Sequence, residues 1–301
     1  MRYLNTPESG NPSVISQDFA PLKMDILCCH YWWLKVWKNS NLSFPYWRIY
    51  HNNKAGASIT FEGNTWGLTA GKIAIIAPNT PFSTNYDPDN KVPQRDDFLI
   101  GGPYRTIEEK DLDDDGLIEH LYVHFNLSPP YDRVSPGIYI VDADLYLRNR
   151  IEQLSDFSKD NPKHFGRVKN LLLNTIITEL LFAIPDDEWA TSSSDERVKS
   201  TIKHVDLNLV DKLSNESLAK RINMATNSFA RLFKTETGTA LQQYVLTRRV
   251  DKACMMLHHS NASIEEIAEE CGFCDRYHFS RMFKKIARKS PADYRSSYNY
   301  F

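Results

Sequence analysis

The C-terminal third of this 301-residue chain contains two copies of one supersecondary pattern. The first copy is SLAKRINMATNSFARLFKTETG, residues 217–238, and the second is IEEIAEECGFCDRYHFSRMFKKIARKSP, residues 264–291. In each copy a short helical stretch, a tight turn and a second helical stretch follow one another, and FARLFK at 229–234 aligns with FSRMFK at 279–284. The repeat therefore predicts two helix-turn-helix units in an all-α region.

The turn of the second copy carries a CxxC spacing, Cys271 and Cys274, which in other contexts belongs to a redox or metal site. The first copy fills the same turn with INMA and has no cysteine there. Gly272 aligns with Asn223, and these are the residue types that most readily take a positive φ after a helix. Zinc needs two further ligands, and the sequence has no second CxxC. We therefore predict a structural turn with a buried Cys271, and neither a metal nor another cofactor.

The second helix of each unit combines an apolar face with a basic and polar face. Phe229 and Phe233 in one copy, and Phe279 and Phe283 in the other, mark the inward side. Arg pairs with guanine in the major groove, Asn with adenine, and Lys with phosphate. A solvated helix face is the alternative, and two such faces within one repeat make it the weaker interpretation. The predicted DNA contacts are Asn227, Ser228, Arg231, Lys234, Arg276, Tyr277, Arg281, Lys284 and Lys285.

Charge and spacing agree with a nucleic-acid partner. Residues 195–301 hold 18 Lys and Arg against 13 Asp and Glu, a balance of +5, whereas residues 1–194 hold 18 against 25, a balance of −7. A helix of about 20 residues between the two copies would span ~30 Å. This is close to the ~34 Å repeat of DNA, so both second helices could enter successive major grooves.

Residues from about 195 to 298 resemble the DNA-binding domain of AraC-type transcription regulators. The resemblance lies in SLAKRI, LFKTETG, YVLTRRVDKA, SIEEIAEECGF, HFSRMFKK and SPADYR. It implies a DNA-binding domain at 195–301 that reads a bipartite site in double-stranded DNA through two helix-turn-helix units. It also implies RNA polymerase as a partner, because activation is the usual outcome in this family.

Two residues depart from the family pattern. Ala287 and Arg288 stand where an aromatic residue and a glycine are usual, and an arginine is disfavoured in a left-handed conformation, so we expect a different helix end. Ala225 stands where a capping Ser is common, which should cost about 1 kcal/mol unless Thr226 replaces it.

The N-terminal half has the pattern of a β protein. YWRIYHN, GASITFEG, KIAIIAP, HLYVHFNL and GIYIVDA are rich in β-branched and aromatic residues, and turn residues bound them. Such strands predict a barrel or sandwich, with residues 87–115 as long loops. The family resemblance implies a cupin-like, effector-sensing β-barrel at 1–148 and a helical dimerisation or linker region at 149–194. The expected fold class is therefore α+β, and a homodimer is a hypothesis.

The helical region has a wide apolar stripe and a polar end. The stripe is formed at helical spacing by Val168, Leu172, Ile176 and Leu180 and is widened by Leu171, Leu173, Ile177 and Leu181. So much apolar surface predicts packing partners on more than one side of the helix. The segment PDDEWATSSSDER, residues 185–197, combines a proline, a serine run and acidic residues, which predicts the linker to the DNA-binding domain.

The front half offers candidate effector residues. Sugar pockets use flat aromatic faces and a few polar groups, so the tryptophans of this half make a carbohydrate effector a hypothesis, with an ordinary core as the alternative. The candidate residues are Trp47, Arg48, His51 and His120.

Two candidate metal motifs are rejected. His120 and His124 would lie ~13 Å apart along a strand, too far to share one ion. DLDDDG at 111–116 begins like a calcium loop, but Tyr122 stands at its twelfth position, so a connecting turn is the better interpretation.

The function predicted is that of a cytoplasmic, sequence-specific transcription regulator controlled by a small molecule, and not an enzyme. The alternative is a β-barrel enzyme with an accessory basic helical domain, which the lack of a metal triad or nucleophile disfavours. The N-terminal stretch has no apolar segment typical of a secretory signal, and no apolar run is long enough for a bilayer, so we expect no membrane partner.

Overall fold

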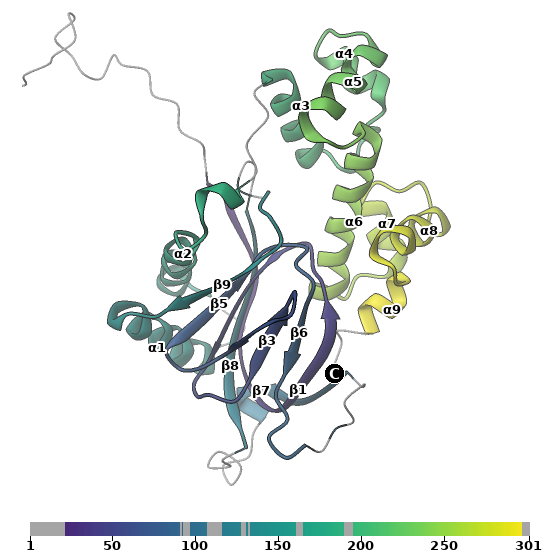
Figure 1. Ribbon diagram of the computed structural model, residues 1–301. Helices are drawn as coiled ribbons and strands as arrows, with labels where there is room; N and C mark the ends of the chain where they lie inside the picture. Colours follow the sequence, from purple (N-terminus) through teal and green to yellow (C-terminus); the bar gives the residue numbers. More distant parts are fainter. Residues whose placement is uncertain are drawn as a thin grey trace, which may run out of the picture.

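The computed structural model describes residues 22–90, 92, 97–106, 116–127, 131, 133–160, 165–189 and 195–296. In Figure 1 the strands of the N-terminal half form one body with two helices beside it, and the helices of the C-terminal third form a second body against one end of the strands. The calcium-like segment that begins at Asp111 lies almost entirely outside the described residues.

The N-terminal body is an antiparallel sheet that curls into a near-closed barrel. Its strands are β1 (Met24–Leu42), β2 (Trp47–Asn52), β3 (Ser58–Phe61), β4 (Asn64–Gly67), β5 (Lys72–Ile76), β6 (Phe82–Asn85), β7 (Phe98–Pro103), β8 (Ile118–Leu127) and β9 (Ile138–Asp142), with a short 3-10 turn η2 (Tyr104–Thr106). Hydrogen-bonded neighbours follow the order β4-β3-β6-β1-β8-β2-β5-β9, and β7 also pairs with β1. The prediction of a β-barrel in an α+β protein is confirmed.

Strand β1 is the longest strand and was not expected from the sequence. Its first part pairs with β8, its middle pairs with both β8 and β7, and its last part pairs with β6. Its register also shifts between Ile26 and Cys28, between Leu34 and Val36, and between Asn39 and Leu42, and each bulge changes the face to which the following residues point. A regular alternation of apolar and polar residues is therefore absent.

The prediction of loops across residues 87–115 is wrong at β7, which lies inside that range. β7 carries glycines where it pairs with β1, and a Cβ on Gly101 would lie 2.5 Å from the Trp33 carbonyl oxygen. The glycine permits a close strand approach, but it also removes the side-chain pattern by which a strand is recognised in sequence.

Two helices, α1 (Leu145–Asp160) and α2 (Arg167–Leu181), pack on one face of the sheet. On β2, Trp47 and Ile49 face these helices, while Tyr50 faces the barrel interior, as the two-residue period of a strand requires. On α2 the residues Leu173, Ile176, Ile177 and Leu180 are buried. All four belong to the predicted stripe, but Val168 and Leu171, which were also predicted there, are each 63% exposed.

The ordered part of the N-terminal body extends into the predicted linker. A short 3-10 turn, η4 (Asp186–Glu188), follows α2, and Trp189 packs against Trp47 with ring centroids 5.7 Å apart. Trp189 also makes an isolated β-bridge with Val134. The domain boundaries at 148 and 194 remain predictions, with packing against the barrel now traced as far as Trp189.

The C-terminal body consists of seven described helices. They are α3 (Glu196–Leu207), α4 (Asn215–Arg221), α5 (Thr226–Thr237), α6 (Leu241–His259), α7 (Ile264–Glu270), α8 (Arg276–Ala287) and α9 (Pro291–Ser296). Helix α6 runs between a unit formed by α3, α4 and α5 and a unit formed by α7, α8 and α9 (Figure 1). None of the helices that the structure describes has the length and apolarity needed to cross a membrane.

Candidate DNA-binding face and effector pocket

Both helix-turn-helix turns are built on left-handed backbone conformations. Asn223 has φ 54° and Gly272 has φ 75°, at aligned positions. A Cβ on Gly272 would lie 2.3 Å from the Leu209 carbonyl oxygen, so only glycine fits there. Cys271 is fully buried, whereas Cys274 is exposed. The prediction of a structural turn with a buried Cys271 is confirmed.

The second helices of the two units, α5 and α8, each bury two phenylalanines and turn a polar face to solvent. All nine residues predicted to contact DNA are exposed, among them Arg231 and Lys234 on α5 and Arg281 on α8. Helix α8 is capped by Asp275, whose carboxylate accepts a hydrogen bond of 2.7 Å from the His278 backbone N–H.

The two departures from the family pattern have different outcomes. Ala225 is the N-cap of α5 and makes no side-chain capping bond, so the expected loss of a cap is confirmed. Arg288 ends α8 at φ 62°, and Gly238 ends α5 in the same way at φ 70°. The expectation of a different helix end at Arg288 is therefore wrong, because the arginine accepts the left-handed conformation.

A cavity of about 100 Å³ opens inside the barrel where it meets α6. It is large enough for several water molecules or part of a small ligand. Aromatic rings and a few polar groups from the barrel form most of its wall, and one wall residue comes from the end of α6. The wall consists of Trp32, Trp37, Asn39, Leu42, Phe44, Arg48, Tyr50, Leu99, His120, Tyr122, His124 and His258.

Arg48 is the charged group of this cavity. Its side chain is 5% exposed, and its guanidinium donates hydrogen bonds to the hydroxyls of Tyr50 and Tyr46, the latter at 3.1 Å. The guanidinium carbon lies 3.4 Å from the centre of the Phe44 ring. No carboxylate within the described part of the chain pairs with Arg48, and its Nε has no hydrogen-bond acceptor there. The cavity thus contains a buried positive charge held by rings and hydroxyls.

The four predicted effector residues fall into two groups. Arg48 and His120 line the cavity, and His120 Nδ1 lies 2.7 Å from Asn52 Oδ1. Burial lowers the pKa of His120 to about 3, so this imidazole is neutral at pH 7. Trp47 and His51 lie on β2 with Arg48, and neither is among the residues of the cavity wall.

The end of α6 contacts the barrel beside the cavity. The Tyr46 hydroxyl lies 2.6 Å from His258 Nδ1, and His124 Nδ1 lies 3.4 Å from His259 Nε2. Burial, with the nearby Arg48 cation, holds the pKa of His124 and His258 well below its ordinary value and lowers that of His259 to about 4. All three imidazoles are therefore neutral at pH 7. This junction was missed from the sequence, where the histidine pair at the end of a helix was the only signal.

These features define a class of protein: a DNA-binding transcription regulator with two helix-turn-helix units on one connecting helix, attached to a β-barrel that holds a cavity. A family model described as "Helix-turn-helix domain" matches residues 218–297. Together with the motifs quoted above, the match shows that residues 218–297 resemble the DNA-binding domain of AraC-type transcription regulators.

The relatives are transcription regulators of bacteria. The chain is 24% identical over 238 residues to the Msm operon regulatory protein of Streptococcus mutans, covering 79% of each chain. It is 31% identical over 134 residues to the HTH-type transcriptional activator RhaS of Escherichia coli, covering 42% of this chain and 48% of RhaS. The chain thus spans about half the length of RhaS.

Two solved structures are similar to this chain, one over about a third of its length and the other over most of it. The DNA-binding domain of AdpA, in complex with a target DNA, is 31% identical and covers 35% of this chain and 94% of its own, with a TM-score of 0.34. ToxT from Vibrio cholerae is 9% identical and covers 93% of this chain and 99% of its own, with a TM-score of 0.47.

Proposed function

We propose that this protein binds a bipartite DNA site through α5 and α8 and that a small anionic molecule in the barrel cavity controls this binding. The main observation in support of DNA binding is that α5 and α8 have the same arrangement of buried and exposed residues. Each buries its phenylalanines and leaves basic and polar residues exposed, and α6, which separates the two units, is about 28 Å long at 1.5 Å per residue. This length suits two successive major grooves.

In this proposal Arg231 and Arg281 read base edges, while Lys234, Lys284 and Lys285 contact phosphates. Arg231→Ala or Arg281→Ala should each cost ~1–3 kcal/mol of binding free energy and relax the base preference at one position of the operator. Fluorescence anisotropy with a set of single-base operator variants measures both effects. Lys203→Ala, which removes an exposed charge from α3, is the matched control and should leave affinity and preference unchanged.

Salt dependence separates base contacts from phosphate contacts. Removal of one phosphate contact should reduce the slope of log affinity against log salt by about 0.9. Lys284→Ala should therefore flatten the slope and weaken binding equally on all sequences. If Arg231→Ala and Arg281→Ala also weaken binding equally on all sequences, these arginines do not read bases.

The effector part of the proposal rests on Arg48. A buried guanidinium without a carboxylate partner among the described residues is suited to a ligand that supplies one, and Trp32 and Trp37 line the same cavity. A sugar acid combines an anionic group with a body that packs on aromatic rings. We therefore propose a sugar acid, which refines the hypothesis of a carbohydrate effector.

Paired ligands test this assignment. Isothermal titration with gluconate and glucose, and with galacturonate and galactose, should show binding of the acids only. Arg48→Met should weaken that binding about 10- to 100-fold, because a hydrogen bond to a charged group contributes ~1.5–3 kcal/mol. His51→Gln, on the same strand but outside the cavity wall, should bind as the wild type does. Equal binding of acid and neutral sugar would reject recognition of the charge, and binding that survives Arg48→Met would reject the site.

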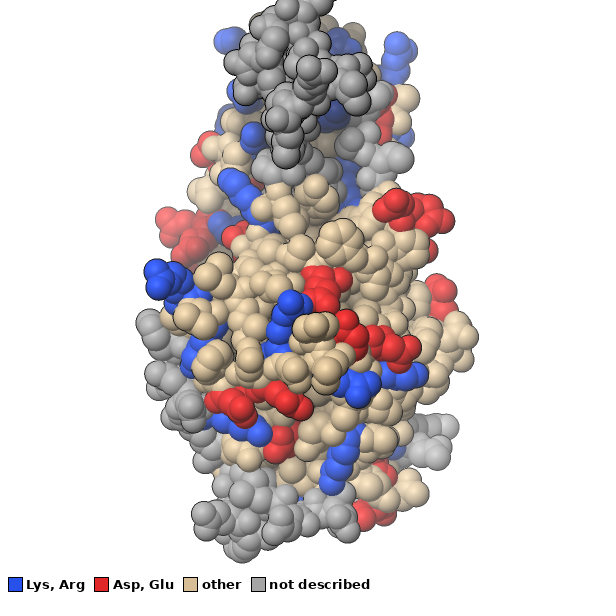
Figure 2. All heavy atoms as spheres, turned by 90° about the vertical axis from the view of Figure 1, so that its left-hand side faces the viewer, with Lys and Arg blue, Asp and Glu red and all other residues tan. Residues whose placement is uncertain are grey.

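A homodimer and activation are further parts of the proposal. Helix α2 leaves Val168 and Leu171 63% exposed, and Phe182 just beyond its end is 86% exposed. Figure 2 views the molecule from the side of α1 and α2, where uncharged side chains cover much of the surface among scattered acidic and basic groups. Such an exposed apolar row on one helix suits contact with the same row of a second copy.

Activation through RNA polymerase is supported by the family and by the naming of RhaS as an activator. Transcription in vitro with purified polymerase tests it, since the transcript yield should rise when this protein is added to an operator template. The relatives are regulators, and we propose that this chain acts in the same way rather than as a barrel enzyme.

A further inference from the structure

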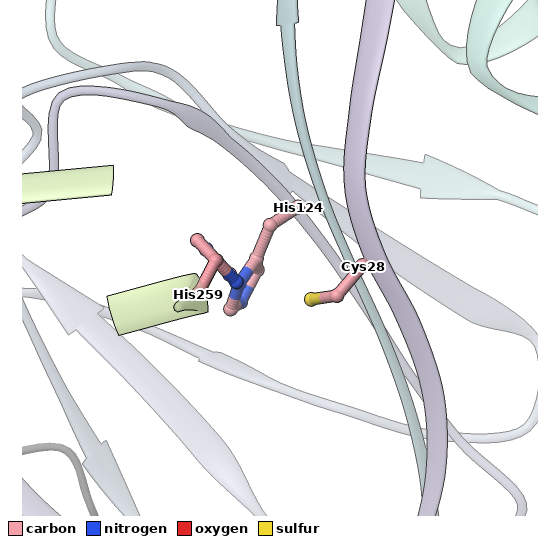
Figure 3. Close-up of side chains that lie close together, drawn as sticks. All are labelled: Cys28, His124 and His259. Carbon is pink, nitrogen blue, oxygen red and sulfur yellow. The ribbon is translucent and has the colours of Figure 1, made fainter. Parts of the chain in front are cut away.

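Three side chains from distant parts of the sequence meet where the barrel contacts α6. Cys28 lies on β1, His124 on β8 and His259 in the last turn of α6, and Figure 3 shows the three side chains pointing toward one another. One ligand atom of each, a thiol sulfur and two imidazole nitrogens, lies within 4.8 Å of the others. Cys28 and His259 are half-buried and His124 is buried, so the cluster is shielded from bulk water.

The backbone brings Cys28 into this cluster by a specific irregularity. Ile26 pairs with Phe125, but Cys28 pairs with His124, so β1 has one extra residue at this point. Without the bulge Cys28 would oppose Val123 and point to the opposite face of the sheet, where Cys29 now lies. The bulge therefore places a thiol beside His124, as bulges elsewhere re-aim a side chain next to a functional site.

The separation of the nitrogens fits a shared ion better than a hydrogen bond. His124 Nδ1 and His259 Nε2 are 3.4 Å apart, which is long for a hydrogen bond. Two nitrogens that bind one tetrahedral zinc ion at ~2.0–2.1 Å are about 3.3 Å apart. The site has one thiol and two neutral imidazoles, the donor types that Zn²⁺ prefers.

We propose that Cys28, His124 and His259 form a Zn²⁺ site that ties the barrel to the connecting helix of the DNA-binding domain. Two ligands belong to the barrel and the third belongs to α6, so a bound ion would fix the position of α6 against the barrel. On binding, the Cys28 thiol loses its proton to solvent and coordinates as a thiolate. The fourth coordination position is left for water.

Zinc titration of the full-length protein tests the site. Protein freed of metal by a chelator should bind one Zn²⁺ per chain in competition with a chromogenic chelator. Cys28→Ser and His259→Gln should each weaken binding at least about tenfold, since loss of even a supporting group around a metal costs ~10- to 100-fold. Cys29→Ala, the adjacent thiol on the other face, and His258→Gln, the adjacent imidazole on α6, are matched controls and should bind as the wild type does.

Cobalt gives an independent readout that does not depend on stability. Co²⁺ in the wild type should show the near-ultraviolet charge-transfer band of a thiolate ligand, and Cys28→Ser should lack it while its circular dichroism spectrum stays unchanged.

The dependence on His259 distinguishes a site that bridges barrel and helix from one confined to the barrel. Absence of stoichiometric zinc binding, binding that survives Cys28→Ser, or binding unaffected by His259→Gln would each overturn the proposal. These experiments measure metal binding alone. Their outcome therefore does not depend on whether the protein binds DNA or a sugar acid.

Discussion

Arg288, the residue that ends α8, holds a backbone conformation that costs an L-residue with a side chain ~1–2 kcal/mol. Gly238 occupies the same position at the end of α5 and has no such cost. Both residues donate their backbone N–H to a carbonyl one turn earlier, Arg288 to Lys284 and Gly238 to Lys234. The two helix ends are therefore equivalent except for the strain at Arg288.

Arg288→Gly should therefore raise the free energy of unfolding by about 1 kcal/mol, the relief of strain being partly offset by the greater freedom of glycine in the unfolded chain. Urea denaturation followed by circular dichroism measures this. Gly238→Ala is the reciprocal control and should lower the free energy of unfolding by a similar amount. A decrease in stability for Arg288→Gly would mean that the arginine side chain makes a compensating contact.

At the scale of helices and strands, sequence patterns predicted the elements whose pattern stays regular. KIAIIAP and HLYVHFNL became β5 and β8 because β-branched and aromatic runs between turn residues are typical of buried strands. Strand β1 was missed because its neighbours change along its length, and β7 was missed because its glycines carry no side-chain pattern. The repeat was predictable because α5 and α8 need the same buried phenylalanines and the same turn.

The candidate sites were predictable only in part, for a similar reason. Arg48 and His120 stand out as polar residues in apolar strands, so the sequence pointed to them. The cluster of Cys28, His124 and His259 has no spacing signal, because its third ligand is 135 residues from its second and the first depends on a bulge. Tertiary contact between domains, rather than any local pattern, creates it.

Helix α2 leads to a prediction about how two copies of the protein assemble. Val168 and Leu171 are three positions apart and share its exposed face. If this face joins two copies, Leu171→Lys should convert a dimer to a monomer, because it places a charge in an apolar contact. Light scattering after gel filtration measures the mass. Leu207→Lys, at a 71% exposed position on α3, is the control and should keep the mass of the wild type. A wild type that is already monomeric at micromolar concentration would reject this interface.

At the scale of the whole molecule, the main feature is the set of contacts between the helical body and the barrel. Each helix-turn-helix unit has its own buried phenylalanines, with Phe283 packed on Tyr294 in the second unit and Phe233 on Tyr244 in the first. Polar contacts to the barrel lie at the end of α6, where Tyr46 meets His258 and His124 meets His259. Near the start of α6, the Arg133 guanidinium carbon lies 5.3 Å from the centre of the Tyr244 ring. The first unit thus has a core of its own, whereas one hydrophobic cluster continues from the barrel interior into the second unit beside the polar contacts.

A fragment of residues 195–301 should therefore fold and bind the operator without the barrel. Its helical circular dichroism signal and cooperative thermal unfolding should be retained, because the barrel packs against one end of α6 and leaves the core of the first unit intact. Anisotropy titrations should show specific binding that no sugar acid changes, since Arg48 is absent from the fragment. The comparison is Tyr46→Phe in the full-length protein, which keeps the barrel but removes the hydroxyl that contacts His258 and accepts a hydrogen bond from Arg48; it should remain ligand-responsive with a smaller change in operator affinity. An unfolded fragment would show that the barrel completes the core of the helical body, and a folded fragment without affinity for the operator would show that the barrel contributes to the DNA-binding surface.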